Sequence, residues 1–278
     1  MIRATVVLGV GLVLWCGGAH AWGPATHAYI AIKVTGLDTR DVVYGAMAPD
    51  ICQGILFDPN AKNHLANLTH AAANDLPAGE FATGFATHNG HWGGDHYAHA
   101  HHNPNNPPNY ATRKILRIRE EFDLSSQEGE GALDIVMDFL VRREFGPQLA
   151  ELIVDSCHGG TRAGVLVDAF ANPLAERVPG MSVETAERAI RQAAWVFRIG
   201  ARVYGRQLAQ DEETLRTLAA QAIRIYFRCD IETAQARLDW AIALCEDDYA
   251  EEMVRECEGI RARMASEPTY VLRSVADQ

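Results

Sequence analysis

The sequence predicts an all-α fold, a multi-helix bundle with a metal site between helices. From about residue 128 onward, apolar residues recur at helical spacing between positions rich in Arg and Glu. No segment shows the sustained apolar–polar alternation of a half-buried strand. The metal site is expected in the first part of the chain, because all the histidines after residue 21 except His158 lie between residues 22 and about 110.

For several helices of the second half, the sequence predicts the position of the N-terminus. Ser182, Asp211 and Asp230 each precede an apolar stripe at helical spacing. The oxygen of such a side chain accepts a hydrogen bond from a free amide group of the first helical turn. We therefore expect helices to start at these three positions. Residues 159–278 are expected to form a helical extension that packs on a first domain over residues 22–158.

The first 21 residues have the pattern of a secretory signal peptide. Arg3 gives the positive start, residues 6–15 form an apolar run, and Ala19-His20-Ala21 matches an A-x-A cleavage site. The apolar run is shorter than the roughly 20 residues that span a bilayer comfortably. We expect cleavage before Trp22 and an exported protein, either periplasmic or fully secreted.

Charge and cysteine count narrow the function classes. The formal net charge is −11, and it becomes −12 once the leader and its single positive charge are removed. Such an acidic protein repels phosphate backbones, so a broad nucleic-acid surface is not expected. Five cysteines follow the leader, an odd number without a CxxC pair, so a thiolate zinc site is not expected either.

The predicted new N-terminus reads Trp22-Gly23-Pro24-Ala25-Thr26-His27. After cleavage, the free amine and the carbonyl group of Trp22 can chelate a metal, and His27 lies on the following helical turn. An N-terminal amine has a pKa near ~8, so a metal displaces its proton at modest cost. We expect both residues to be metal ligands.

An aspartate and a His-rich segment extend this set. Asp50 follows Ala48-Pro49; such an aspartate by itself is usually a helix cap, but it is also a hard oxygen ligand and a competent base. Residues 88–102 read HNGHWGGDHYAHAHH, with six histidines and one aspartate. On a helix, residues four apart share a face, which would bring together His91, Asp95 and His99. A second register uses His101 in place of His99. Alternatively, the segment is solvated and binds metal only with low affinity.

These motifs resemble the zinc-dependent phospholipase C family over roughly residues 22–140. The Trp-Gly-Pro-x-Thr-His start, the downstream Pro-Asp and the His-x-x-x-Asp spacing carry the resemblance. It implies a helical bundle, shared with the single-strand-specific zinc nucleases, that holds a cluster of two or three Zn²⁺ ions. It also implies that Asp50 is the catalytic residue that orients or deprotonates the attacking water.

Two ligand positions of that family remain open in this sequence. One histidine is expected at some distance after the Pro-Asp motif, and His64 and His70 both qualify. The later His-x-x-x-Glu or His-x-x-x-Asp pair of the family is missing. Its nearest substitute is the acidic stripe Glu130, Asp134 and Asp138, of which Asp134 is taken as the ligand, although such stripes are more often solvated faces.

The resemblance implies hydrolysis of a phosphodiester, with a phospholipid head-group ester as the leading substrate and transient contact with a membrane surface. Clustered zinc ions suit in-line attack on phosphorus. A nuclease on the same framework is the second enzyme reading, disfavoured because Lys62 is the only Lys or Arg between residues 41 and 112. Outside the enzymes, a non-catalytic exported metal-binding protein or an inactive family member would also use these histidines.

Overall fold

The computed structural model describes residues 22–71, 75–99, 109–158 and 162–266. This part of the chain contains thirteen α-helices, one 3₁₀ helix and no strand, so the predicted all-α class is confirmed. None of the helices found there is long and apolar enough to cross a membrane.

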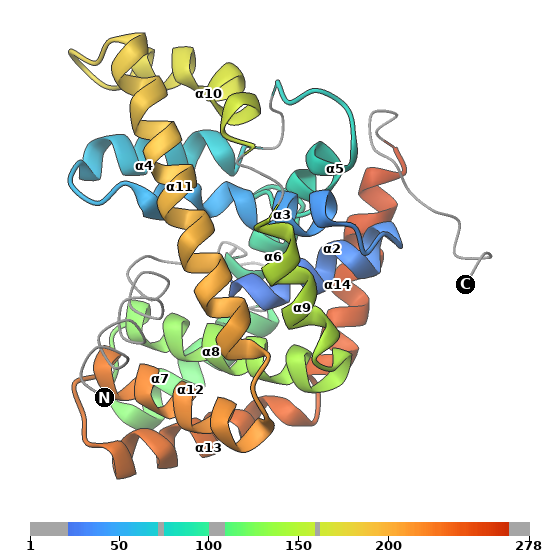
Figure 1. Ribbon diagram of the computed structural model, residues 1–278. Helices are drawn as coiled ribbons and strands as arrows, with labels where there is room; N and C mark the ends of the chain where they lie inside the picture. The colour runs from blue at the N-terminus through green and yellow to red at the C-terminus, as the bar shows by residue number, and fades with distance from the viewer. Residues whose placement is uncertain (1–21, 72–74, 100–108, 159–161, 267–278) are drawn as a thin grey trace.

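The first helices of the chain are short. They are α2 (Pro24–Thr35), α3 (Arg40–Met47), the 3₁₀ helix η1 (Ala48–Gly54), α4 (Pro59–Thr69), α5 (Glu80–Ala86) and α6 (Gly94–His99). Three more follow: α7 (Tyr110–Phe122), α8 (Ser126–Phe145) and α9 (Gln148–Ser156). The blue α2 and α3 lie at the centre of the molecule (Figure 1).

The second half consists of α10 (Ala163–Arg177), α11 (Val183–Leu208), α12 (Glu212–Tyr226), α13 (Ile231–Glu246) and α14 (Tyr249–Met264). The predicted starts are confirmed, because Ser182, Asp211 and Asp230 each accept a hydrogen bond from the amide three residues on. Helix α11 runs diagonally along one side of the molecule, in front of η1 and α4 (Figure 1).

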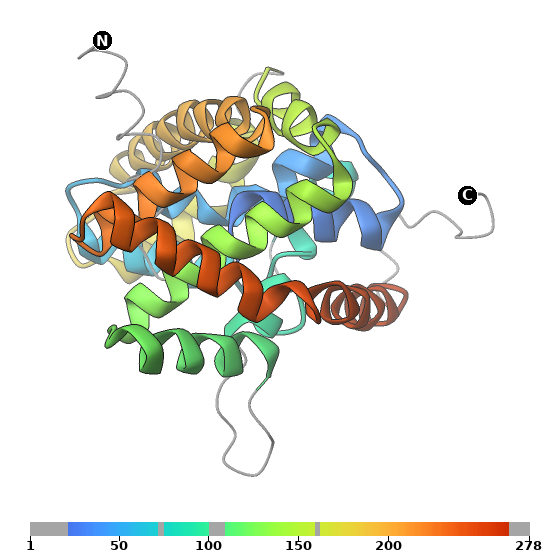
Figure 2. The ribbon, with the colours of Figure 1, turned by 90° about the horizontal axis from the view of Figure 1, so that it is seen from below.

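These helices pack around one main core, beside a small second cluster of buried apolar residues. The cluster of buried apolar side chains runs from Trp22 to Met264 and draws on both halves of the chain. Seen from below, α12 and α13 and the green α7 lie across the outer side of α8 (Figure 2), and α14 packs on α2. The helices of residues 162–266 therefore complete the core around the first part of the chain.

The close crossing of α3 and α5 depends on two glycines. A side chain at Gly84 would overlap the carbonyl oxygen of Val42, and one at Gly45 would overlap that of Phe81. Because both glycines lack a Cβ atom, the two backbones touch directly. This crossing brings His88, in the turn after α5, to the carbonyl oxygen of Ala46 at the end of α3, directly before η1.

Candidate metal centre

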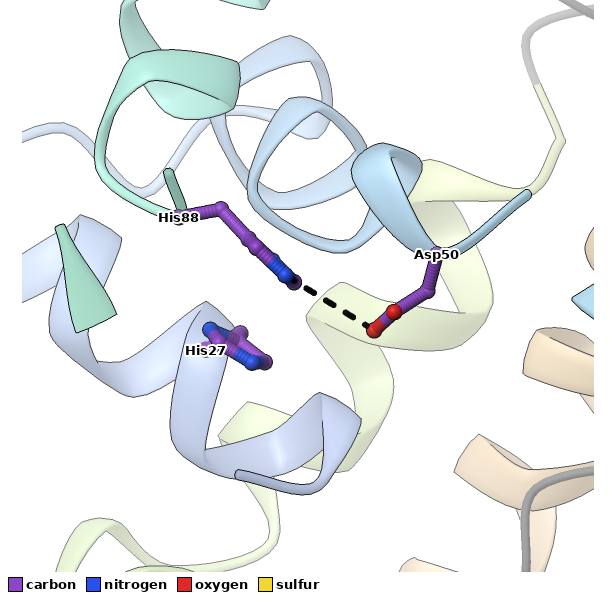
Figure 3. Close-up of side chains that lie close together, drawn as sticks. All are labelled: His27, Asp50 and His88. Atoms are coloured by element: carbon purple, nitrogen blue, oxygen red, sulfur yellow. Dashed lines mark ion pairs between the residues drawn. The ribbon is translucent and has the colours of Figure 1, made fainter. Parts of the chain in front are cut away.

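Five polar side chains from five different segments converge between α2, η1 and α4 to α6. Two overlapping groups offer ligand atoms within 4.8 Å of one another: His27, Asp50 and His88, and His70, His88 and Asp95. The first group is fully buried. Figure 3 shows the rings of His27 and His88 and the carboxylate of Asp50 directed toward the same space.

The backbone fixes how two of the imidazole rings are protonated. The Nδ1 atom of His88 lies 2.7 Å from the carbonyl oxygen of Ala46, and the Nδ1 atom of His70 lies 2.9 Å from that of Ala66. A carbonyl oxygen only accepts, so each Nδ1 carries the proton and donates it. In the neutral rings Nε2 is then the atom with a free lone pair, which is the arrangement that protein carbonyls impose on metal-binding histidines.

The two Nε2 atoms face each other at 3.2 Å. Two neutral rings would therefore direct lone pairs at one another, which is unfavourable unless a proton or a metal ion lies between them. Two nitrogen ligands of a tetrahedral zinc ion, each about 2.05 Å from the metal, lie roughly 3.3 Å apart. The separation of His70 and His88 thus fits the bite of one zinc ion.

The carboxylate of Asp50 completes the inner part of the site. Asp50 is 3% exposed, and its two oxygens lie 3.6 Å from His70 Nε2 and 3.9 Å from His88 Nε2. Asp50 sits in the first turn of η1, after Pro49, so the Ala-Pro-Asp motif does begin a helix. Asp50 therefore does not cap the helix but lies within its first turn, and its side chain faces both imidazoles.

His27 reaches the site from the first turns of α2. Its ring stacks on that of His88, with the ring centres 3.7 Å apart and the planes 15° from parallel. An added Cβ at Gly94 would lie 3.2 Å from His27 Nδ1, so the start of α6 closes over this ring. The predicted ligand His27 is thus fully enclosed next to Asp50 and His88.

A tight turn joins α5 to α6 and brings His88 next to Asp95. Gly94 donates to the Thr87 carbonyl oxygen at 2.7 Å, and Asp95 donates to that of His88 at 2.9 Å. The expectation of one helix through His91, Asp95 and His99 is therefore wrong, because the helix begins only at Gly94. The turn, rather than helical spacing, places Asp95 beside the histidines.

The structure brings together some of the predicted ligands and not others. His70 belongs to the cluster, whereas His64 is half-buried on α4 outside both groups, and His91 is exposed in the turn before α6. His99 ends α6, but its side chain is not described, and His101 lies outside the described residues. His88, which both groups share, was missed; its place at the head of the His-rich segment was the available signal.

Asp134 lies within electrostatic range of the cluster. Its Oδ1 is buried and, within the described residues, has no hydrogen-bond partner. Burial raises the pKa of this carboxyl well above its usual range, and the negative charges of Glu130, Asp138, Asp50 and Asp95 raise it further. A buried oxygen without a donor, in a field of like charge, is an arrangement that a cation would relieve.

Asp138, one turn further along α8, accepts hydrogen bonds from two other helices. Its Oδ1 accepts hydrogen bonds from the amide of Thr26 at 2.8 Å and from the hydroxyl of Thr26 at 2.7 Å. Its Oδ2 accepts a short hydrogen bond from the hydroxyl of Tyr204. Burial raises the pKa of Asp138 to about 6, although these hydrogen bonds lower it. Asp138 therefore ties α2, which carries His27, to α8 and α11.

Trp22 is buried at the entrance to α2. Its side chain is 1% exposed, and its indole nitrogen donates to Glu256 Oε1 at 3.1 Å. The carbonyl oxygen of the next residue, Gly23, accepts from the amide of His27 at 3.1 Å. Residue 22 thus lies directly before the turn that carries His27.

The surroundings shift the pKa values of His70 and His88 in opposite directions. Burial lowers the pKa of His70, but its hydrogen bond with Asp50 and the charges of Asp95 and Asp50 outweigh burial and raise it to about 9. Burial lowers the pKa of His88, and the neighbouring His70 lowers it further. Without metal, the cluster therefore holds a proton on His70 near neutral pH.

The donor set fits a zinc ion. Imidazole nitrogen and carboxylate oxygen are ligands that zinc accepts, at about 2.0–2.2 Å. An ion held by His70 and His88 would replace the proton that His70 holds without metal and would bind both Nε2 atoms. Asp134 belongs to neither group of ligand atoms, although its buried oxygen has no donor within the described residues. Comparisons with family models, curated proteins and solved structures found no match.

Proposed function

We propose that this protein is an exported zinc-dependent phosphodiester hydrolase of the phospholipase C type. The observation that carries the proposal is the pair of Nε2 atoms of His70 and His88, 3.2 Å apart, in rings whose Nδ1 atoms are already bound to backbone carbonyls. His27, Asp50 and Asp95 surround that pair. A single imidazole donates one lone pair, so His88 serves one ion, and a second ion would draw on the remaining groups.

The residues have distinct tasks in such a reaction. His70, His88 and Asp95 would hold one ion, while His27, Asp134 and the N-terminal amine of Trp22 would serve the others. Asp50 would orient a water molecule and take up its proton, since its carboxylate faces both imidazoles and is shielded from solvent. When bound, zinc supplies Lewis acidity toward water and toward the phosphate oxygens.

Because the chain is acidic, we expect an anionic substrate to bind at the metal centre and not over a broad surface. The chain is acidic overall, and only bound cations would reverse the field locally. Leu56 and Phe57, which follow η1, are 49% and 89% exposed. These two apolar side chains, six and seven residues after Asp50, offer a contact for a lipid surface, and on this basis we propose a lipid substrate.

The test is metal content together with a substrate panel, on chain purified after leader removal. We expect two or three tightly bound zinc ions per chain by mass spectrometry, and release of a phosphorylated alcohol from phosphatidylcholine vesicles. Single-stranded DNA serves as the competing substrate. Asp50→Asn should abolish turnover, while Asp75→Asn, at an exposed position, is the matched control.

Two results would overturn the proposal. Metal of variable stoichiometry, removed by brief chelation and without any hydrolysis, would identify an exported metal-binding protein instead. If the chain binds no zinc after leader removal, neither a zinc hydrolase nor a metal-binding protein is supported. Cleavage of DNA but not of lipid would retain the zinc centre and replace the substrate.

A further inference from the structure

Glu256 is a fully buried carboxyl group in the middle of α14. Its Oε1 accepts the hydrogen bond from the Trp22 indole, and within the described residues its Oε2 has no hydrogen-bond partner. A carboxyl group loses its hydration when it is buried, and an apolar residue would fill the same space without that loss. The presence of Glu256 therefore requires an explanation beyond packing.

The contact with Trp22 supplies a geometric reason. The two residues are 234 positions apart, and the indole is almost completely enclosed. An indole has a single polar atom, its Nε1–H donor. An acceptor 3.1 Å from Nε1 adds a directional constraint to this packing, because a flipped ring would leave the buried donor without a partner. Glu256 thus fixes the orientation of the Trp22 side chain.

The backbone beside Trp22 is held from the other side. A side chain at Gly23 would overlap the carboxylate of Asp138, and the same carboxylate binds the amide of Thr26 at 2.8 Å. Residue 22 is therefore fixed through its ring by α14 and through the following turn by α8. The carbonyl oxygen of Gly23, the residue after Trp22, accepts from the amide of His27, so residue 22 directly precedes the helical turn that carries His27.

We propose that Glu256 is the positioning residue for Trp22, holding its indole so that the amine exposed by leader removal is directed at the metal bound by His27. This inference rests on the proposed function, because it needs both a processed chain and a metal in the cluster. A neighbour that holds a ligand in place typically raises metal affinity by about 10- to 100-fold. Glu256 would act through Trp22 without touching the metal.

The experiment compares zinc and cobalt titrations of three processed variants. Glu256→Leu removes the acceptor, Glu256→Gln keeps an acceptor oxygen without the charge, and Glu258→Leu changes an exposed residue of the same helix. We expect Glu256→Leu to weaken one metal site by at least about tenfold and to alter the visible spectrum of bound cobalt. Glu256→Gln should retain most of the affinity, and Glu258→Leu should match the wild type.

A second variant keeps the inference testable if Glu256→Leu does not fold. Trp22→Phe retains the α-amine and an aromatic ring but has no donor for Glu256. It should weaken the same site by a similar factor, and the double variant Trp22→Phe/Glu256→Leu should be no weaker than either single one. One extra residue before Trp22 should abolish the difference between wild type and Trp22→Phe.

The two proposals fail in different ways. Wild-type zinc content with unchanged affinity in folded Glu256→Leu and Trp22→Phe would overturn the role of Glu256 and leave the zinc hydrolase in place. A wild-type chain without zinc would overturn both. A loss of thermal stability in the metal-free variants, with no change in metal affinity, would show Glu256 to be structural only.

Discussion

The Nε2 atoms of His70 and His88 lie 3.2 Å apart, although each ring already donates its Nδ1 proton to a backbone carbonyl. The two rings come from the end of α4 and from the turn after α5. Their protonation is set by carbonyl groups that belong to helices α4 and α3, so the fold prepares the site without any metal. The same relationship determines which substitutions should abolish metal binding.

Replacing His88 by alanine should remove the residue that both clusters share. We expect His88→Ala to lose at least one equivalent of zinc and all phosphodiesterase activity. The matched control is His64→Ala, which changes a half-buried histidine of α4 that lies outside both groups. Zinc content by mass spectrometry should stay at the wild-type value in this control. Equal metal loss in both variants would contradict the assignment.

Zinc affinity should depend on pH through His70. The pKa of this histidine is raised to about 9, so at pH 7.5 zinc must displace its proton. We expect the apparent affinity to rise about tenfold per pH unit from pH 7 toward pH 9 and then to level off. Calorimetry in two buffers of different ionisation heat should count one proton released per zinc at this site. Binding that is independent of pH over this range would contradict it.

The stability of the metal-free protein should change in the opposite direction. A histidine with a raised pKa stabilises the fold fully below its unfolded value of 6.5, and this contribution is lost as the pH rises through about 9. From these two values we expect a loss of about 3 kcal/mol in the free energy of unfolding between pH 6.5 and 9. Urea denaturation at several pH values measures it, and His70→Gln should flatten the profile.

The sequence was sufficient for the fold class and for part of the site. Helix starts such as Ser182 could be predicted because a cap is a local interaction between a side chain and its own first turn. Asp50 and His27 could be singled out because each sits in a distinctive short motif. These motifs do not contain the distance between the two residues, which depends on how the tertiary fold places α2 relative to η1.

The errors have a common physical cause. His91 was placed with Asp95 by helical spacing, but Asn89 Oδ1 accepts hydrogen bonds from the amides of His91 and Trp92 and holds a turn there instead. Such side-chain hydrogen bonds compete with helix formation. The choice between His64 and His70 depended on the side of α4 that faces η1, and this is decided by packing rather than by spacing.

Replacing Asp134 by asparagine should act on stability and on metal binding with opposite signs. Burial and four nearby carboxylates raise the pKa of Asp134 well above its usual range, so holding this group in the metal-free fold at pH 8 is unfavourable. We expect Asp134→Asn to raise the metal-free free energy of unfolding by at least about 1 kcal/mol. Zinc affinity should fall at least about tenfold if the carboxylate is a ligand.

The control for Asp134 is Glu121→Gln, which removes one exposed charge on α7. It should change neither the unfolding free energy nor the zinc affinity measurably. A stabilised Asp134→Asn variant with unchanged zinc affinity would assign Asp134 to the surrounding field and leave the ligand role to other residues.

Asp138 should matter for stability even without metal. Asp138→Ala leaves the amide and hydroxyl of Thr26 and the hydroxyl of Tyr204 without their buried acceptor. We expect a loss of about 3 kcal/mol in urea denaturation of the metal-free protein, and about 1 kcal/mol for Tyr204→Phe, which removes one donor. Asp168→Ala, at an exposed position of α10, should stay within about 0.5 kcal/mol. If Asp138→Ala were as stable as this control, the hydrogen bonds of Asp138 with Thr26 and Tyr204 would contribute nothing measurable to the free energy of unfolding.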